Sequence, residues 1–327
     1  MELKIELSQV SHIGHGLKRP ECILTTASGF LYVAHLGNGV LQIAPNGTQT
    51  IIGSTAEVEG KAWIPNGLAL MPDGSFMVAN MGEGGGLWRL DRDGRLSAVL
   101  RAVDGVTLTA TNFVLLDTLG RLWITVTTRC WPISNAFSPL DGPTVTDGYL
   151  VLMDANGSRI VADGFGFANE VRLSNDGKQL YVIETFARRI TRFAITADSR
   201  LIEREVFARF GYGDFVDGGA FDSEGYFWVA SIVSNRLLRI APDGKHHVVM
   251  QDNDPEHVAM VERKLAARSL GREDVQKTPA RVLKNIASVS FGGADLRTVY
   301  LGSLGGDTLG MFRSPIPGLA PVHWNFN

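Results

Sequence analysis

The chain has 327 residues, 45% of them hydrophobic, and contains 37 glycines, a composition typical of a globular protein with many turns. Its 31 basic and 34 acidic residues leave a net charge of −3, which excludes the basic surface that nucleic-acid-binding proteins present. No apolar run reaches membrane-spanning length, the N-terminus shows no signal-like segment, and Cys22 and Cys130 are too few for a disulfide framework. We therefore expect a cytoplasmic protein with free thiols and no nucleic-acid or membrane partner.

A β-hairpin pattern recurs along the chain: a strand with alternating apolar residues, a tight turn that contains glycine, and a second strand that ends in polar residues. It occupies residues 21–35, 66–80, 112–126, 167–185 and 217–231, with a degenerate sixth copy at 288–303. The clear turn glycines are separated by 45, 46, 57 and 48 residues and are Gly29, Gly74, Gly120, Gly177 and Gly225. This period suits the four-stranded blade of a β-propeller.

Each hairpin is followed by another strand pair with its own turn, such as Val40 to Gly47, so one repeat supplies the inner and outer halves of a blade. The sequence therefore predicts an all-β fold, a six-bladed β-propeller of four-stranded antiparallel blades that forms a single domain over residues 1–327. Little chain follows the sixth hairpin, so we expect an N-terminal strand at Leu3 to Leu7 to complete the last blade. Closure of the ring removes exposed sheet edges.

Two insertions interrupt the repeat. The first, at 129–143, has three prolines and two aromatic residues. The second, at 252–284, contains a predicted helix near 254–271 that begins with Asp254 as N-cap and Pro255 as first residue and ends at Gly271. The pattern leaves open whether either insertion covers a mouth of the ring or only decorates the surface.

One position of the repeat carries polar side chains on the inner strand. It lies eight residues before each turn glycine, and in the sixth copy it is found by aligning Tyr300 with Tyr181. The residues are Glu21, Asn66, Asn112, Asn169, Asp217 and Ser288. An inner strand ordinarily prefers Val, Ile or Thr, so β-propensity does not explain five side-chain carbonyl or carboxylate oxygens in phase. Because inner strands surround the propeller axis, these positions should form a ring at one depth of the channel.

Two carboxylates and several amide oxygens suit a hard divalent cation. Calcium, which accepts roughly six to eight oxygen ligands, is expected first and magnesium second. Manganese and zinc are further alternatives, with zinc the less favoured because the seven histidines and the two cysteines show no ligand spacing. The alternative without a metal is that these side chains only hydrogen-bond and hydrate the channel.

A second polar column follows the turns, where the chain returns to the same height. It consists of His35, Asn80, Val126, Glu184, Ser231 and Ser303. Its side chains either support the metal or line the pocket, or they represent ordinary polarity at strand ends. His35 and Glu184 are of particular interest because both can transfer protons.

Four segments carry a family resemblance: Glu21 after Arg19-Pro20, Asn169 before its Asn-Asp-Gly turn, Asp217-Gly218 before Phe221, and the stretch from Ser288 to Tyr300. Together they resemble the SMP-30/gluconolactonase/luciferin-regenerating-enzyme family, in the family's order and over nearly the whole chain outside the insertions. The resemblance implies a six-bladed propeller with a divalent cation in its channel. It also implies hydrolysis, most often the opening of a lactone.

The same resemblance implies roles for individual residues. Glu21, Asn112, Asn169 and Asp217 match the metal ligands, and Asn66 is a further ligand or a water-mediated contact. Asp217 is similar to the residue proposed as base or nucleophile in the family, and Glu21 is the other carboxylate assigned to catalysis. The alternative is that Asp217 is a ligand only and that water bound to the cation attacks the substrate.

Departures from the family pattern bear on the substrate. Ala110 stands where sugar-lactonase members have arginine, and Glu170 follows Asn169 where a glycine is usual. Nearby aromatic residues should make the mouth apolar, namely Phe113, Phe165, Phe167 and Phe215. We therefore expect a small-molecule substrate less polar than a sugar lactone, and no obligate protein partner. The rival hypotheses are another metal-assisted reaction on a cyclic metabolite or phosphotriester, and a non-enzymatic ligand-binding propeller with a structural metal.

Overall fold

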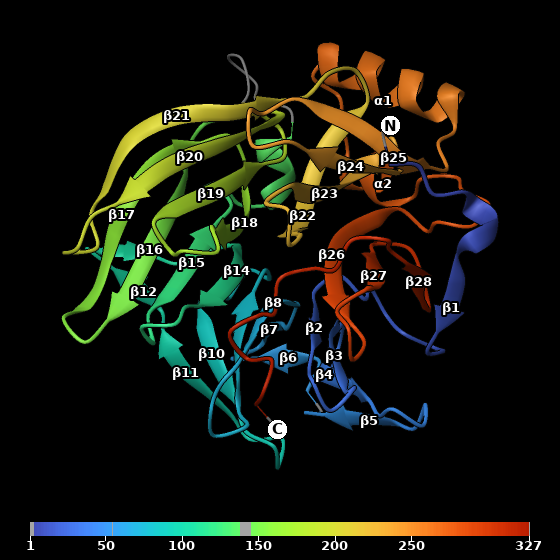
Figure 1. Ribbon diagram of the computed structural model, residues 1–327. Coiled ribbons are helices and arrows are strands. Elements are labelled where there is room, and N and C mark those ends of the chain that lie inside the picture. Colours follow the sequence, from blue (N-terminus) through green and yellow to red (C-terminus); the bar gives the residue numbers. More distant parts are fainter. Residues whose placement is uncertain (1–2, 54, 138–144, 327) are drawn as a thin grey trace.

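The computed structural model describes residues 3–53, 55–137 and 145–326, and in this part of the chain six four-stranded antiparallel sheets surround one axis (Figure 1). Each sheet is one blade, and the chain passes from the innermost strand of a blade to its outermost strand before it enters the next. The predicted six-bladed β-propeller is therefore confirmed.

The first three blades follow the first three hairpins of the sequence. Blade one consists of β2 (Ile23–Thr25), β3 (Leu31–His35), β4 (Gly39–Ile43) and β5 (Gln49–Ile52). Blade two consists of β8 (Pro65–Leu70), β9 (Phe76–Asn80), β10 (Leu87–Leu90) and β11 (Leu96–Leu100). Blade three consists of β14 (Thr111–Leu116), β15 (Leu122–Val126), β16 (Gly148–Asp154) and β17 (Gly157–Phe165). Small hairpins join these blades, namely β6 (Glu57–Val58) with β7 (Lys61–Ala62) and β12 (Ala102–Val103) with β13 (Val106–Thr107).

The last three blades complete the ring. Blade four consists of β18 (Ala168–Leu173), β19 (Gln179–Glu184), β20 (Arg189–Ile195) and β21 (Leu201–Arg209). Blade five consists of β22 (Asp214–Phe221), β23 (Phe227–Val233), β24 (Arg236–Ile240) and β25 (His246–Gln251). Blade six consists of β26 (Ile286–Gly292), β27 (Thr298–Ser303), β28 (Leu309–Arg313) and the N-terminal β1 (Ser11–Ile13). Apolar side chains of adjacent blades pack together into the core, where Trp63, Trp123 and Trp228 are fully buried.

The N-terminal strand closes the ring, but not where the sequence predicted it. Strand β1 pairs with β28 and places Ser11 opposite Met311, so closure by an N-terminal strand is correct. The prediction of Leu3 to Leu7 was wrong, because Ile5 instead donates its backbone N–H to the carbonyl of Val249 in blade five at 2.8 Å. Ile5 is buried against blade five. This contact explains why residues 3–7 alternate between apolar and polar although they form no strand of blade six.

The second insertion contains two helices where the sequence predicted one. Helix α1 (Pro255–Ala266) begins as expected, with the Asp254 carboxylate accepting a hydrogen bond from the backbone N–H of His257 at 2.9 Å. It ends at Ala266, before Gly271, because Arg268 adopts a left-handed φ of 55°. Gly271 instead precedes a second helix, α2 (Arg272–Gln276). Among the described residues, no helix has the length and apolar character that a membrane crossing requires.

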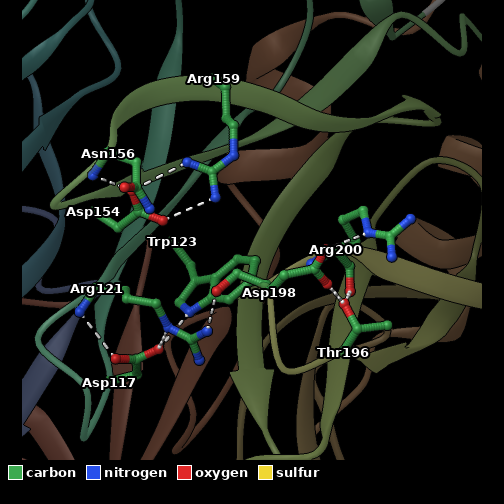
Figure 2. A network of polar contacts seen from close by, with 10 residues as sticks. Asp117, Arg121, Trp123, Asp154, Asn156, Arg159, Thr196, Asp198 and Arg200 are labelled. Carbon is green, nitrogen blue, oxygen red and sulfur yellow. Dashed lines mark hydrogen bonds and ion pairs between the residues drawn. The ribbon is translucent and has the colours of Figure 1, made fainter.

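The turn of the inner hairpin in blade three is held by Asp117 (Figure 2). Its Oδ1 accepts hydrogen bonds from two backbone N–H groups of the turn, both at 2.9 Å. Its Oδ2 accepts from Arg121 Nε at 2.6 Å and from Trp123 Nε1 at 2.9 Å. In blade five, Asp222 Oδ2 likewise accepts from Trp228 Nε1 at 2.8 Å. The repeat therefore conserves turn hydrogen bonds between blades as well as the apolar pattern.

Candidate active site

The ring residues leave the regular pairing of the inner strands. In blades two to five the ladder shifts register at the ring position, and the residues skipped there include Asn66, Asn112, Asn169 and Asp217. A β-bulge redirects a side chain away from the direction that the pleat dictates. The bulges therefore release these polar side chains toward the channel, where all six ring residues are at most 4% exposed.

Three ring residues, Glu21, Asn169 and Asp217, line a cavity of about 40 Å³. The polar part of its wall is completed by Arg19, Thr185, Arg272 and Gln276. The apolar part consists of Met81, Ile133, Phe137, Phe167, Phe186, Ile232, Val275 and Leu304. Such a volume accommodates roughly a cation and one or two water molecules.

Two of the three ring residues in the cavity have a buried oxygen without a hydrogen-bond donor in the described part of the chain, namely Oδ1 of Asn169 and Oδ1 of Asp217. Oε2 of Glu21 lies at the same cavity and has only the ion pair with Arg19. Because buried polar atoms in proteins almost always have a partner, two such oxygens beside a carboxylate at one cavity point to an electropositive ligand. Carboxylate and amide oxygens are the donors that calcium and magnesium prefer, so these residues fit a hard divalent cation.

A zinc site has less support from the side chains. Zinc prefers nitrogen and sulfur ligands, often three or four together. Over residues 3–53, 55–137 and 145–326, no three His, Cys, Asp or Glu side chains form a group that could hold a metal. Cys22 and Cys130 are free thiols, and neither lines the cavity.

The carboxylates around the ring repel one another. Burial, together with the negative charges of Glu21 and Glu170, raises the pKa of Asp217 well above its usual range. Burial also raises the pKa of Glu170 to about 7, although Arg172 Nη2 lies 2.6 Å from its Oε2 and opposes that shift. A cation bound between Glu21 and Asp217 would offset this repulsion.

Arg19 and Asn66 hold Glu21 in place. Arg19 Nη2 forms an ion pair with Glu21 Oε2 at 2.5 Å, and Arg19 Nη1 donates to Asn66 Oδ1 at 2.6 Å. Asn66 Nδ2 in turn donates to Glu21 Oε1 at 3.3 Å and to Asn112 Oδ1 at 3.0 Å. Ser288 Oγ donates to the backbone carbonyl of Glu21. Asn66 and Ser288 therefore support the ring, and Asn112 contacts it through Asn66 without lining the cavity.

The second polar column lies outside the cavity wall. Glu184 accepts hydrogen bonds from a backbone N–H, from Arg189 and from Thr191, and Asn80 bonds three backbone groups of neighbouring loops. Burial lowers the pKa of His35, whose Nδ1 has no partner among the described residues. The contacts of Glu184 and Asn80 hold strand ends together, and a supporting role for this column in catalysis stays a prediction.

The cavity has an aromatic wall, but it is not the wall that the sequence suggested. Phe167 lines the cavity, whereas Phe165 and Phe215 are fully buried in the core and Phe113 lines a different cavity. Phe137 and Phe186 are the other aromatic residues of the wall, with ring centroids 4.9 Å apart. Counting residues near the ring could not distinguish side chains that face the cavity from those that face the blade interior.

Both insertions reach the mouth that holds the ring. The 3₁₀ helix η2 (Ile133–Ala136) of the first insertion contributes Ile133, and α2 of the second contributes Arg272, Val275 and Gln276. Residues 138–144 of the first insertion lie outside the described residues. Sequence reasoning identified both insertions but none of these wall residues, because the period of a helix does not reveal which mouth it meets.

A second and larger cavity, about 490 Å³ in volume, contains none of the ring residues. Phe113, Arg172 and the C-terminal residues Leu319 to His323 line it. Among the described residues of its wall, no buried carboxylate or amide oxygen lacks a donor, so the small cavity is the better candidate site.

The fold and the ring together define a β-propeller with an oxygen-rich centre at its axis. Residues 53–261 match the family described as SMP-30/Gluconolactonase/LRE-like region, and the chain belongs to this family. The chain is 27% identical over 238 residues to a 6-deoxy-6-sulfogluconolactonase from Pseudomonas putida, covering 72% of this chain and 67% of that protein. It is 28% identical over 244 residues to pentonolactonase XacC from Haloferax volcanii, covering 74% and 67%.

A solved structure shares the fold over the full length of both chains. It is described as a calcium-binding protein, regucalcin, from Agrobacterium tumefaciens, and it superposes with a TM-score of 0.68 at 16% sequence identity. At this identity the likeness concerns the fold. The propeller and the family are thus established independently of the predicted ligands.

Proposed function

We propose that this protein is a lactonase that depends on a divalent cation, calcium in the first instance, held by Glu21, Asn169 and Asp217. The single observation that carries the proposal is the pair of buried oxygens without donors, on Asn169 and Asp217, that lines one cavity with the carboxylate of Glu21. Family membership by distant homology supports a carboxylic ester hydrolase of the lactonase type, since the two curated relatives are sugar lactonases. Asn112, joined to the ring through Asn66, is a further candidate ligand.

The reaction requires a polarised ester carbonyl and an activated water molecule. A bound divalent cation supplies both, because it withdraws charge from the carbonyl oxygen and lowers the pKa of water. Water adds to the carbonyl carbon, the bond from that carbon to the ring oxygen breaks, and the ring oxygen takes up a proton to give a hydroxy acid. Asp217, which lines the cavity, accepts the proton of the attacking water, and Arg19 and Asn66 keep Glu21 oriented.

The substrate is proposed to have an apolar ring, less polar than that of a sugar lactone. Phe137, Phe167 and Phe186 form a continuous aromatic surface beside the ring oxygens, with centroid separations of 4.8 to 5.6 Å. Segments η2 and α2 contribute to the cavity wall, and their movement is proposed to admit the substrate. Closure afterwards excludes water other than the reacting molecule.

The test is hydrolysis of a panel of lactones and esters by metal-stripped protein, with calcium, magnesium, manganese or zinc added back. Asp217→Asn should abolish turnover with the fold intact, whereas Asp93→Asn, at an exposed turn, serves as the matched control. Activity that returns with one cation and is lost only in Asp217→Asn supports the proposal. No turnover of any lactone or ester under any cation would overturn it.

Product analysis separates the rival hypotheses. Hydrolysis adds one water molecule to the product, whereas a non-hydrolytic opening of a cyclic metabolite adds none, and phosphotriester cleavage releases a phosphodiester. A non-enzymatic propeller with a structural metal predicts calcium-dependent thermal stability without turnover of any substrate in the panel.

A further inference from the structure

Two arginines line the cavity with N–H groups that have no acceptor among the described residues. Arg272, the first residue of α2, is half-buried, and no acidic side chain or hydrogen-bond acceptor of the described residues pairs with it. Arg19 uses its terminal nitrogens on Glu21 and Asn66, but its buried Nε has no partner in the same part of the chain. By contrast, Arg172 outside the cavity is paired with a carboxylate at 2.6 Å.

The two guanidinium groups affect each other electrostatically. Burial and the positive charge of Arg19 lower the pKa of Arg272, and the charge of Glu21 opposes this shift. Holding two like charges beside one partly buried cavity costs free energy unless a counter-charge is present. A divalent cation would balance the carboxylates of Glu21 and Asp217. Because Arg19 already has Glu21 as its ion-pair partner, the charge that requires an anion from outside the protein is that of Arg272.

We propose that the substrate is a lactone bearing an oxyanion substituent, a carboxylate in the first instance, which binds Arg272 while the lactone carbonyl faces the ring. This inference rests on the proposed function for the reaction, but not for the binding of the anion. A guanidinium group binds a carboxylate through two parallel N–H donors, which fixes orientation as well as charge. The aromatic wall of Phe137, Phe167 and Phe186 selects a ring with few hydroxyl groups.

The substrate is therefore a lactone acid with an apolar ring, and its hydrolysis consumes one water molecule to give a dicarboxylate with one hydroxyl group and one released proton. Arg272 is a specificity-determining residue in this scheme. It contacts the substituent and not the reacting carbonyl, so its loss should raise KM more than it lowers kcat.

The experiment compares two lactones that share one ring and differ in its substituent, which is charged in 5-oxotetrahydrofuran-2-carboxylate and neutral in its hydroxymethyl counterpart. Arg272→Gln should raise KM for the carboxylate by about 10- to 100-fold, because a hydrogen bond to a charged group is lost, and leave KM for the hydroxymethyl lactone within about threefold. Arg272→Lys should recover part of the loss. Arg263→Gln, which makes the same change at an exposed position of α1, is the matched control.

Direct binding distinguishes failure of this inference from failure of the proposed function. Inorganic sulfate is titrated into the calcium-loaded protein in a calorimeter. Sulfate should bind the unchanged protein and Arg263→Gln, and it should not bind Arg272→Gln. If sulfate binding depends on Arg272 but no lactone is turned over, the anion site is supported and the proposed lactonase function is rejected. Turnover of both lactones at equal KM, or sulfate binding unaffected by Arg272→Gln, overturns the inference and leaves the lactonase standing.

Discussion

The carboxylate of Glu170, in blade four, packs against the bare backbone of Gly218 in blade five. A β-carbon on Gly218 would lie 2.5 Å from Glu170 Oε1 and 2.7 Å from the backbone carbonyl of Ala287 in blade six. Three neighbouring blades therefore meet at the residue that follows Asp217. Gly218 is needed here for close approach, because the space for a side chain is already filled.

Gly218→Ala should consequently displace Glu170 or Asp217. We expect a loss of about 1 to 3 kcal/mol in the free energy of unfolding, typical of overpacking in a core, and a larger loss of turnover because the ring geometry changes. Denaturant unfolding and lactone hydrolysis measure the two effects. Gly211→Ala is the control, since Gly211 is exposed and a β-carbon there meets no atom within 4 Å. Equal stability of the two variants would contradict this account of the glycine.

Calcium should stabilise the folded protein through the ring oxygens. At a calcium concentration of about 100 times Kd, mass action adds roughly 2.7 kcal/mol to the free energy of unfolding, so Tm should rise and a chelator should reverse the rise. Glu21→Gln and Asn169→Ala should weaken calcium binding by at least about tenfold. Asn175→Ala, in an exposed turn of the same blade as Asn169, should bind calcium as the unchanged protein does. Full calcium affinity in Asn169→Ala would exclude that side chain as a ligand.

Asp117→Asn should destabilise blade three. The substitution removes the negative charge from an atom that accepts hydrogen bonds from Arg121 and Trp123, and it leaves the buried guanidinium of Arg121 uncompensated. Breaking such a buried pair typically costs about 3 to 5 kcal/mol. The neighbouring exposed pair in Figure 2 provides the control, because Asp198→Asn removes the charge from a carboxylate that contacts only Thr196 and Arg200 in the figure, at an exposed turn, and should leave Tm unchanged. Similar Tm values for both variants would argue against the turn as a structural anchor.

His323 should make stability fall in mild acid. Burial, assisted by the charge of Arg172, lowers the pKa of His323 from 6.5 to about 4. Between these values the unfolded chain binds a proton that the folded chain does not, so the free energy of unfolding decreases as pH falls through this window, by up to about 3 kcal/mol. Above pH 6.5 the contribution is constant.

Unfolding curves at several pH values from 4 to 7 test this linkage. His323→Gln cannot titrate, so its stability should vary less with pH than that of the unchanged protein. His12→Gln, at an exposed position, should retain the original dependence. Identical slopes for His323→Gln and the unchanged protein would assign the acid sensitivity to other groups.

The repeat made the blades and the ring predictable, because turn glycines and apolar alternation are local properties of the sequence. Glu21, Asn169 and Asp217 meet at one cavity although they lie far apart along the chain, and the phase of the repeat alone brought them together. Ser288, placed by alignment of Tyr300, also lies against Glu21. Periodicity therefore carries long-range information when each copy occupies an equivalent place around an axis.

Segments outside the repeat could not be placed from the sequence. Arg272 and Phe137 lie in insertions whose position over one mouth depends on packing between distant segments, and no period of the sequence records it. The same holds for the N-terminus, where the alternation of Leu3, Ile5 and Leu7 suited a strand but packs against blade five. Gly271 is typical of a helix terminator in the sequence, but a glycine can also precede a helix, as Gly271 precedes α2 in the structure.

The division of the cavity wall between repeat and insertions has a consequence for engineering. The oxygens at the axis belong to inner strands that are fixed by neighbouring blades, whereas Ile133, Phe137 and Arg272 belong to segments that contribute no strand to any blade. Chimeras that graft other loops at 129–143 or 252–284 should therefore change which molecules are accepted while retaining the cation and its reaction. Residues that select the substrate and residues that hold the cation therefore lie in different segments of the chain.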